Sequence, residues 1–161
     1  MTEEGHKSGR KKSAEKTALV TAVDYLARQA QSEKKLREKL QRKGFPQEDI
    51  DAAIERLIER KYLDDADLCA QQFMYLYNES RYSVRQIFVK LMQRGFDKEL
   101  IRSAVPPDTA EREAAVAERV LAMKFKPTDK KQKMMANLYQ KGFSVDTAHA
   151  AVRNFTEGAE A

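Results

Sequence analysis

A pattern that occurs three times along the chain constrains its fold more than any other feature. Each copy has two apolar residues four positions apart, then a Gly-Phe pair, then two further apolar residues. The copies are Leu36, Leu40, Gly44, Phe45, Ile50 and Ile54; Ile87, Leu91, Gly95, Phe96, Ile101 and Val105; and Met134, Leu138, Gly142, Phe143, Ala148 and Val152. A sequence that repeats at nearly fixed spacing folds as tandem copies of one structural unit.

The spacing within each copy predicts a helix, a tight turn and a second helix. Two apolar residues four apart lie on one face of a helix, and a Gly just beyond them adopts the left-handed conformation that ends it. Pro46, Asp97 and Ser144 then stand where the next helix begins, with Asp97 and Ser144 as side-chain caps.

A further amphipathic segment precedes each pair of helices. Its apolar residues are Val23, Leu26 and Ala30 in the first copy, Cys69, Phe73 and Leu76 in the second, and Val116, Val120 and Met123 in the third. Ser32 and Ser83 are placed to cap the middle helices, whereas the third copy has Lys130 there, so its cap is expected at Thr128 or Asp129. The prediction is an all-α fold of three tandem three-helix repeats in an elongated array, without strands.

The repeat boundaries follow from breaks in the pattern. Pro106-Pro107 marks the second boundary and Asp64-Asp65 the first. We expect repeats at 17–63, 64–107 and 108–156, between a flexible polar tail at 1–16 and a disordered tail at 157–161. Units this small need neighbours to remain folded, so the repeats should stack. The outer side of the middle helix in the second repeat carries Phe88, Val89 and Met92, which indicates contact with neighbouring repeats or a surface for a partner protein.

Several functional classes are disfavoured by composition. The sequence has one cysteine, Cys69, and two histidines, so neither a disulfide nor a metal site is expected. It has no Gly-rich phosphate loop after a strand and no evident pair of nucleophile and base, which argues against an enzyme and against a cofactor. No apolar run approaches the roughly 20 residues of a membrane span, and the N-terminus is polar, so a cytoplasmic protein is expected.

Positive charge is concentrated around the middle helix of every repeat. Residues 32–43 contain six basic and two acidic residues, residues 83–94 contain three and none, and residues 124–141 contain six and one. The cations expected to form one stripe are Lys34, Lys35, Lys39, Arg42 and Lys43, then Arg85, Lys90 and Arg94, then Lys130, Lys131, Lys133 and Lys141. Such a stripe suits phosphates or an acidic protein groove, although a solvated helix face explains many runs of charge. Because the middle helices have few Asn or Gln residues, any DNA binding should be directed to the backbone.

Several of these segments resemble the RecX family of regulatory proteins over about residues 17–156. The first repeat matches in Tyr25-Leu26-Ala27-Arg28, Ser32 to Leu36, Lys43-Gly44-Phe45 and Tyr62-Leu63-Asp64-Asp65. The later matches are Arg81 to Ile87, Arg94-Gly95-Phe96, Tyr139 to Phe143 and Arg153-Asn154-Phe155. The chain departs from the family at Ser83, where many relatives have Gly, and at Leu68-Cys69, where an aromatic and then a small residue are usual.

The resemblance implies a partner and a function. RecX proteins bind in the helical groove of the RecA nucleoprotein filament and suppress ATP hydrolysis, strand exchange and LexA cleavage. An elongated array of positive units suits that role, since several weak contacts along a polymer add through effective concentration. The main alternative is a general helical DNA-binding protein, with DNA as the partner.

Two of the matching segments are also interpreted structurally. We expect Tyr62 and Leu63 to pack in the core and Asp64 or Asp65 to cap the next helix. For Arg81 and Tyr82, a turn anchor with Tyr82 packed against a neighbouring helix is the first interpretation, and contact with a partner is the second.

Overall fold

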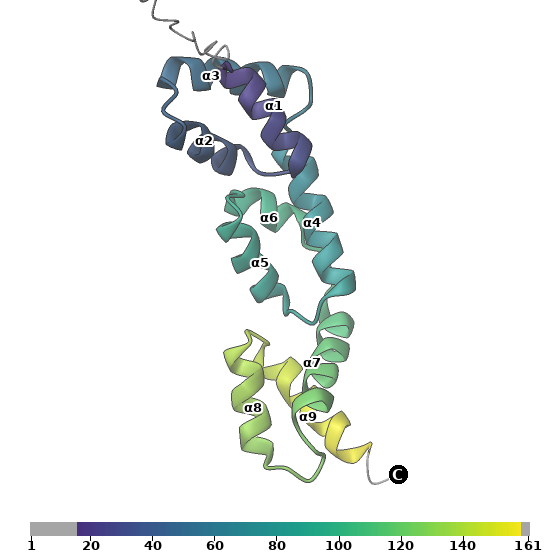
Figure 1. Ribbon diagram of the computed structural model, residues 1–161. Helices are drawn as coiled ribbons and strands as arrows, with labels where there is room; N and C mark the ends of the chain where they lie inside the picture. The colour runs from purple at the N-terminus through teal and green to yellow at the C-terminus, as the bar shows by residue number, and fades with distance from the viewer. Residues whose placement is uncertain (1–15, 159–161) are drawn as a thin grey trace, which may run out of the picture.

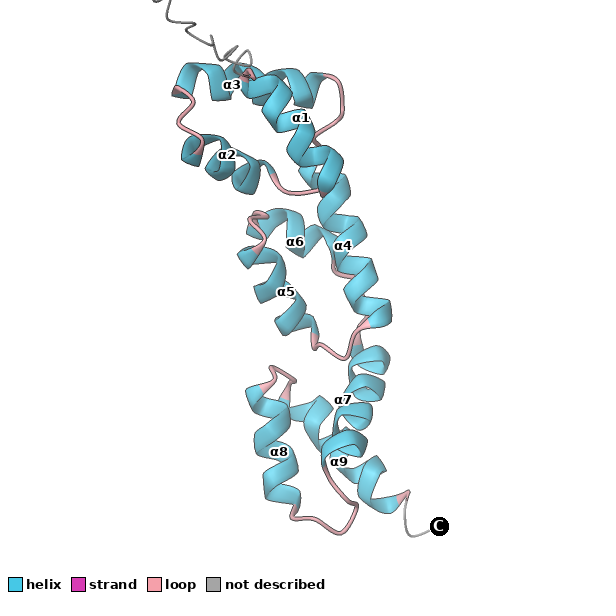
Figure 2. Ribbon diagram, viewed as in Figure 1, coloured by secondary structure: helices cyan, strands magenta, loops and turns pink. Residues whose placement is uncertain are grey.

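The structure, a computed structural model, describes residues 16–158 as nine α-helices without a strand (Figures 1 and 2). The helices are α1 (Ala18–Arg28), α2 (Glu33–Arg42), α3 (Gln47–Glu59), α4 (Asp65–Glu79), α5 (Val84–Gln93), α6 (Lys98–Ala104), α7 (Ala110–Lys124), α8 (Lys131–Gln140) and α9 (Val145–Glu157). The last helix therefore reaches Glu157, the first residue of the segment predicted as a tail. The remainder of both predicted tails, 1–15 and 159–161, lies outside the described residues.

Each set of three consecutive helices encloses its own apolar core. The first core is centred on Leu36 and Ile50, the second on Phe73 and Ile87, and the third on Leu121 and Met134. The apolar positions of the repeated pattern are buried in all three copies, apart from Phe45 and Val105, which are partly buried against the same cores. The predicted all-α array of three-helix units is confirmed, and Figure 1 shows it as an elongated column.

The three repeated glycines end their helices as predicted. Gly44, Gly95 and Gly142 have φ angles of 87°, 92° and 89°. In each copy the glycine N–H and the following Phe N–H donate back to carbonyls of the last helical turn, as in a Schellman motif. The Phe side chain then packs on the core, so that one local motif both ends the helix and anchors the turn.

Most predicted caps form, but two do not. The hydroxyls of Ser32, Ser83 and Ser144 accept the expected backbone N–H bonds, and Asp64 caps α4. Asp97 precedes α6 without a side-chain bond. The expected shift of the α8 cap was wrong, because Lys130 itself is the N-cap residue and makes no side-chain bond there.

Four apolar residues expected to face the core are exposed instead. Tyr62 is 68% exposed while its neighbour Leu63 is buried. Tyr62 follows Lys61, whose φ of 58° turns the chain outward at the end of α3. Val23, Ala30 and Met123 are also exposed, since Ala22 and Leu121 hold the inward positions of α1 and α7 and Ala30 lies beyond the end of α1.

The middle helices of the three repeats are joined end to end. The Ser32 hydroxyl at the start of α2 donates to the carbonyl of Arg94 at the end of α5, at 2.7 Å. The Ser83 hydroxyl at the start of α5 donates in the same way to Lys141 at the end of α8, at 2.6 Å. We call these contacts joint 1 and joint 2. They place α8, α5 and α2 in one column with their helix dipoles aligned head to tail, which is the favourable arrangement.

Candidate cationic interface at the joints

Each joint is held by a second bond besides that of its serine. In joint 1 the N–H of Glu33 donates to the Asp65 carboxylate of α4, at 3.0 Å. In joint 2 the N–H of Val84 donates to the Glu113 carboxylate of α7, at 3.1 Å. An acidic residue from the next repeat therefore completes the N-terminal cap of α2 and of α5, where helices have unsatisfied N–H groups.

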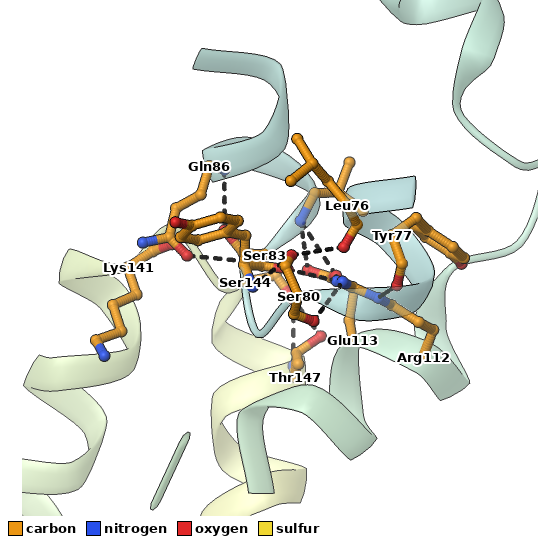
Figure 3. Close-up of polar contacts among 12 residues, drawn as sticks. Leu76, Tyr77, Ser80, Ser83, Gln86, Arg112, Glu113, Lys141, Ser144 and Thr147 are labelled. Atoms are coloured by element: carbon orange, nitrogen blue, oxygen red, sulfur yellow. Dashed lines mark hydrogen bonds and ion pairs between the residues drawn. The ribbon is translucent and has the colours of Figure 1, made fainter. Parts of the chain in front are cut away.

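Joint 2 is reinforced by Arg112, which sequence reasoning had missed (Figure 3). Its guanidinium lies 4.6 Å from the Tyr77 ring centroid and pairs with Glu113 at 2.6 Å. It also donates to the carbonyls of Tyr77 and Tyr82, which fixes the loop between α4 and α5 against α7. The adjacent Arg-Glu pair near the start of a helix was the available signal, but it does not reveal which loop the arginine reaches.

Among the described residues, joint 1 has no such arginine, and Asp64 precedes Asp65 where Arg112 precedes Glu113. The pKa of Asp65 is raised above its usual value, mainly by burial and further by the neighbouring carboxylates of Glu33, Asp97 and Asp64, although the bond from the Glu33 N–H lowers it. The ionised form of Asp65 is therefore less favourable in the folded protein than in water. The two joints have the same bonding pattern but different electrostatic support.

Predicted cations gather in a hollow at each joint. The hollow at joint 1 is lined by Lys35, Lys39 and Arg94, with Ser32 and Gln72. The hollow at joint 2 is lined by Arg85, Lys90 and Lys141, with Tyr82 and Gln140. For the part of the chain that the structure describes, neither lining includes an acidic residue. Each hollow thus combines cations from the middle helix of one repeat with one at the end of the middle helix of the next repeat.

Two of these lysines, at equivalent positions of the repeat, are stacked on tyrosines from different elements, Tyr25 of α1 and Tyr82 of the loop before α5. Lys39 lies 5.4 Å from the Tyr25 ring centroid, and Lys90 lies 4.6 Å from that of Tyr82. A cation–π contact orients the ammonium without neutralising its charge. Tyr82 also packs against the second core, so its predicted role as an anchor of the turn is confirmed. The stacking of these lysines on the two tyrosines was not predicted, because nothing in the local spacing links Tyr25 to Lys39.

The remaining predicted cations lie on either side of the hollows. Lys34 lies at joint 1, Arg42 and Lys43 are at the end of α2, and Arg81 is exposed before α5. Lys130, Lys131 and Lys133 surround the start of α8, about 15 Å from Lys141 along the helix axis. Among all these stripe residues within 16–158, Lys35 and Arg42 alone form ion pairs, at 3.5 and 4.0 Å, both with Glu38. These pairs are exposed and therefore weak, so they neutralise little of the positive charge.

The one cysteine of the sequence belongs to the second core and lines neither hollow. Cys69 is fully buried, and burial raises the pKa of its thiol, so the nucleophilic thiolate is disfavoured. Within residues 16–158 no cluster of His, Cys, Asp or Glu is arranged to hold a metal ion. No helix in this range is long and apolar enough to cross a membrane.

Phe88 and Met92 pack partly against the second core, while Val89 is 48% exposed beside joint 2.

Taken together, the end-to-end middle helices and the three separate cores define an all-helical tandem-repeat protein. Residues 18–57 match the family model described as RecX, first three-helix domain. A regulatory protein RecX from Caldanaerobacter subterraneus is 31% identical over 138 residues, which cover 85% of this chain and 70% of the relative. The chain belongs to the RecX family of regulatory proteins, as its sequence segments had indicated.

Other relatives and solved structures agree with this assignment. The RecX protein of Neisseria gonorrhoeae is 28% identical, with 87% of this chain and 92% of the relative covered. That of Bacillus licheniformis is 31% identical, but the match covers 55% of its length. A crystal structure of RecX from Lactobacillus salivarius superposes with a TM-score of 0.72 at 20% identity, covering 86% of this chain and 94% of that one, which shows the shared fold.

Proposed function

We propose that this protein is a negative regulator of the RecA recombinase, which binds along the groove of the RecA nucleoprotein filament. The proposed effects are inhibition of ATP hydrolysis, strand exchange and LexA cleavage in the cytoplasm, without chemistry by the chain itself. Membership of the RecX family supports a regulatory role. The observation that carries the proposal is the recurrence of one cationic hollow at both joints of the column.

The geometry suits a repeating partner. Each of the two hollows is lined by a lysine that stacks on a tyrosine. Together they would present two similar patches of positive charge to a polymer. Each contact is weak alone, but the second forms at the effective concentration set by the first. We propose the repeats 17–63, 64–107 and 108–156 as the units that contact successive parts of the filament, with Lys130, Lys131 and Lys133 extending the surface at its far end.

The test is RecA ATPase activity on single-stranded DNA with increasing amounts of this protein. We expect progressive inhibition by the native chain and much weaker inhibition when Arg85, Lys90 and Arg94 are changed together to Glu. The matched control changes Lys98, Arg119 and Arg153 to Glu, since these exposed cations lie on α6, α7 and α9 and line neither hollow. Both variants lose the same charge, so equal loss of inhibition would contradict a specific surface.

A second candidate function, general DNA binding, is favoured by the same exposed cations and by the pI of about 9.2. It predicts tight binding to DNA without RecA, with an affinity that falls steeply as salt increases. Titration of DNA in the absence of RecA, at several salt concentrations, separates the two candidates. Strong DNA binding together with an unchanged RecA ATPase would favour the second.

A further inference from the structure

Within residues 16–158, the end of α2 is an uncovered copy of a surface that is covered at both joints. A Cβ atom built on Gly95 would lie 2.5 Å from the Ser32 Oγ, and one on Gly142 would lie 3.1 Å from the Ser83 Oγ. A Cβ on Gly44 would meet nothing within 4 Å, although Gly44 has the same left-handed backbone. Within residues 16–158 no repeat precedes the first one. Of the three equivalent helix ends, the end of α2 is therefore the one that no serine covers in this range.

The open end has a defined shape and charge. Its hollow has an apolar floor that includes Leu19, Phe45 and Ala53. Lys16, Lys43 and Arg56 supply three cations around it, against the carboxylate of Asp49 in the lining and that of Asp24, which pairs with Lys16 at 2.7 Å. The surface therefore combines apolar area and positive charge with the C-terminal carbonyls of a helix. At the other two glycines, the corresponding carbonyls of Arg94 and Lys141 each receive a serine hydroxyl at the N-terminus of a helix.

We propose that this open end is a docking site for the N-terminus of a helix from a partner protein, with a hydroxyl N-cap and an acidic first turn. The partner's hydroxyl donates to the carbonyl of Lys43, just as Ser32 donates to that of Arg94 and Ser83 to that of Lys141. Acidic residues are common in the first turn of helices, where the dipole favours them, and here they meet the cationic rim. The inference goes beyond regulation of RecA and does not require RecA as the partner.

A second copy of this chain is a poor occupant. The N-termini of α2 and α5 are already engaged in the joints. The start of α8 is the end of the column that matches the open surface, but it carries Lys130, Lys131 and Lys133 and has no hydroxyl cap. These lysines would lie against Lys43 and Arg56, and like charges repel at such distances. The two ends of the column are thus mismatched for polymerisation of the chain on itself.

The test uses the full-length, isotopically labelled protein and an acetylated, alanine-based helical peptide that begins Ser-Glu-Glu-Leu. We expect the peptide to shift the amide resonances of Leu19, Gly44 and Phe45, with weaker binding for a peptide that begins Ser-Lys-Lys-Leu. Arg56→Glu should weaken binding about fivefold, within the range of one exposed charge contact. Arg60→Glu, at the C-cap of the same helix but outside this hollow, is the matched control and should leave binding unchanged.

The outcomes are distinct from those of the ATPase test. Equal binding of the two peptides, shifts confined to the joint hollows, or no shift at millimolar peptide would overturn the proposal. Concentration-dependent shifts of the same amides without peptide would also overturn it, since a second copy would then cover the surface. The amide spectrum of each variant reports whether it is folded, and Lys43→Glu serves as a second rim variant if Arg56→Glu unfolds.

Discussion

The side-chain hydroxyl of Ser83 donates a hydrogen bond of 2.6 Å to the carbonyl of Lys141, 58 residues further along the chain. The same hydroxyl accepts the N–H of Gln86 and so caps α5. The Ser83 hydroxyl therefore binds the C-terminal end of α8 and caps the N-terminus of α5. Ser32 and Arg94 are related in the same way, so the junction itself is part of the repeat.

Replacement of Ser83 by Ala should destabilise the protein more than the loss of an ordinary cap. We expect the free energy of unfolding to fall by about 2–3 kcal/mol, because both the cap and the bond to Lys141 are lost at a buried site. Ser144→Ala is the control, since the bonds of that hydroxyl stay within its own helix start, and should cost about 1 kcal/mol. Urea unfolding followed by circular dichroism measures both, and equal losses would show that the joint bond contributes nothing.

Two of the helix-ending glycines, Gly44 and Gly95, should differ in their tolerance of a side chain. Gly44→Ala should cost about 1–2 kcal/mol from the left-handed backbone alone. Gly95→Ala should cost about 1–3 kcal/mol more, because its methyl group would lie 2.5 Å from the Ser32 hydroxyl and separate the repeats at joint 1. Thermal unfolding of both variants checks the order. Equal destabilisation would mean that joint 1 accommodates the methyl group without loss of stability.

Asp65 should tolerate an amide but not the loss of its acceptor. At neutral pH we expect Asp65→Asn to be as stable as the native chain or slightly more so, because the amide oxygen still accepts the Glu33 N–H and no buried charge remains. Asp65→Ala should lose about 1 kcal/mol through the unpaired N–H.

The pH dependence of the stability difference between the native protein and Asp65→Asn follows from the direction of the Asp65 pKa shift. Because the folded state raises the pKa of Asp65, it holds the proton more tightly than the unfolded state does. This group therefore makes the native protein less stable as pH rises from the unfolded pKa through the folded one. Any advantage of Asp65→Asn should disappear as pH falls through that window. Urea unfolding of both proteins at several pH values measures it, and an advantage that grows in acid would contradict the assignment.

Arg112 should be the most sensitive polar residue of joint 2. Arg112→Met would leave the Glu113 carboxylate buried without its partner and should cost about 3–5 kcal/mol. Adding Glu113→Gln should recover part of this loss, since the charge is removed while an acceptor for the Val84 N–H remains. Chemical unfolding of the single and double variants tests the pair; a double variant less stable than Arg112→Met would exclude the buried charge as the cause.

The sequence by itself determined the elements of this protein. Helix ends at Gly44, Gly95 and Gly142 and starts at Ser32 and Ser83 could be predicted because they depend on conformational preferences and bonds within a few residues. The buried positions of the middle helices followed from a four-residue spacing. The cations of the stripe were visible as an excess of charge in each copy.

The tertiary structure alone decided how the copies meet. Nothing near Ser83 in the sequence identifies Lys141 as its partner, and nothing near Arg112 identifies the loop that it fixes. Tyr62 was placed in the core by its apolar ring, but the left-handed turn at Lys61 directs it outward. Local spacing sets which face of a helix is apolar, whereas the angle between successive repeats depends on contacts between residues tens of positions apart. That angle brings the cations into two hollows and leaves the end of α2 open.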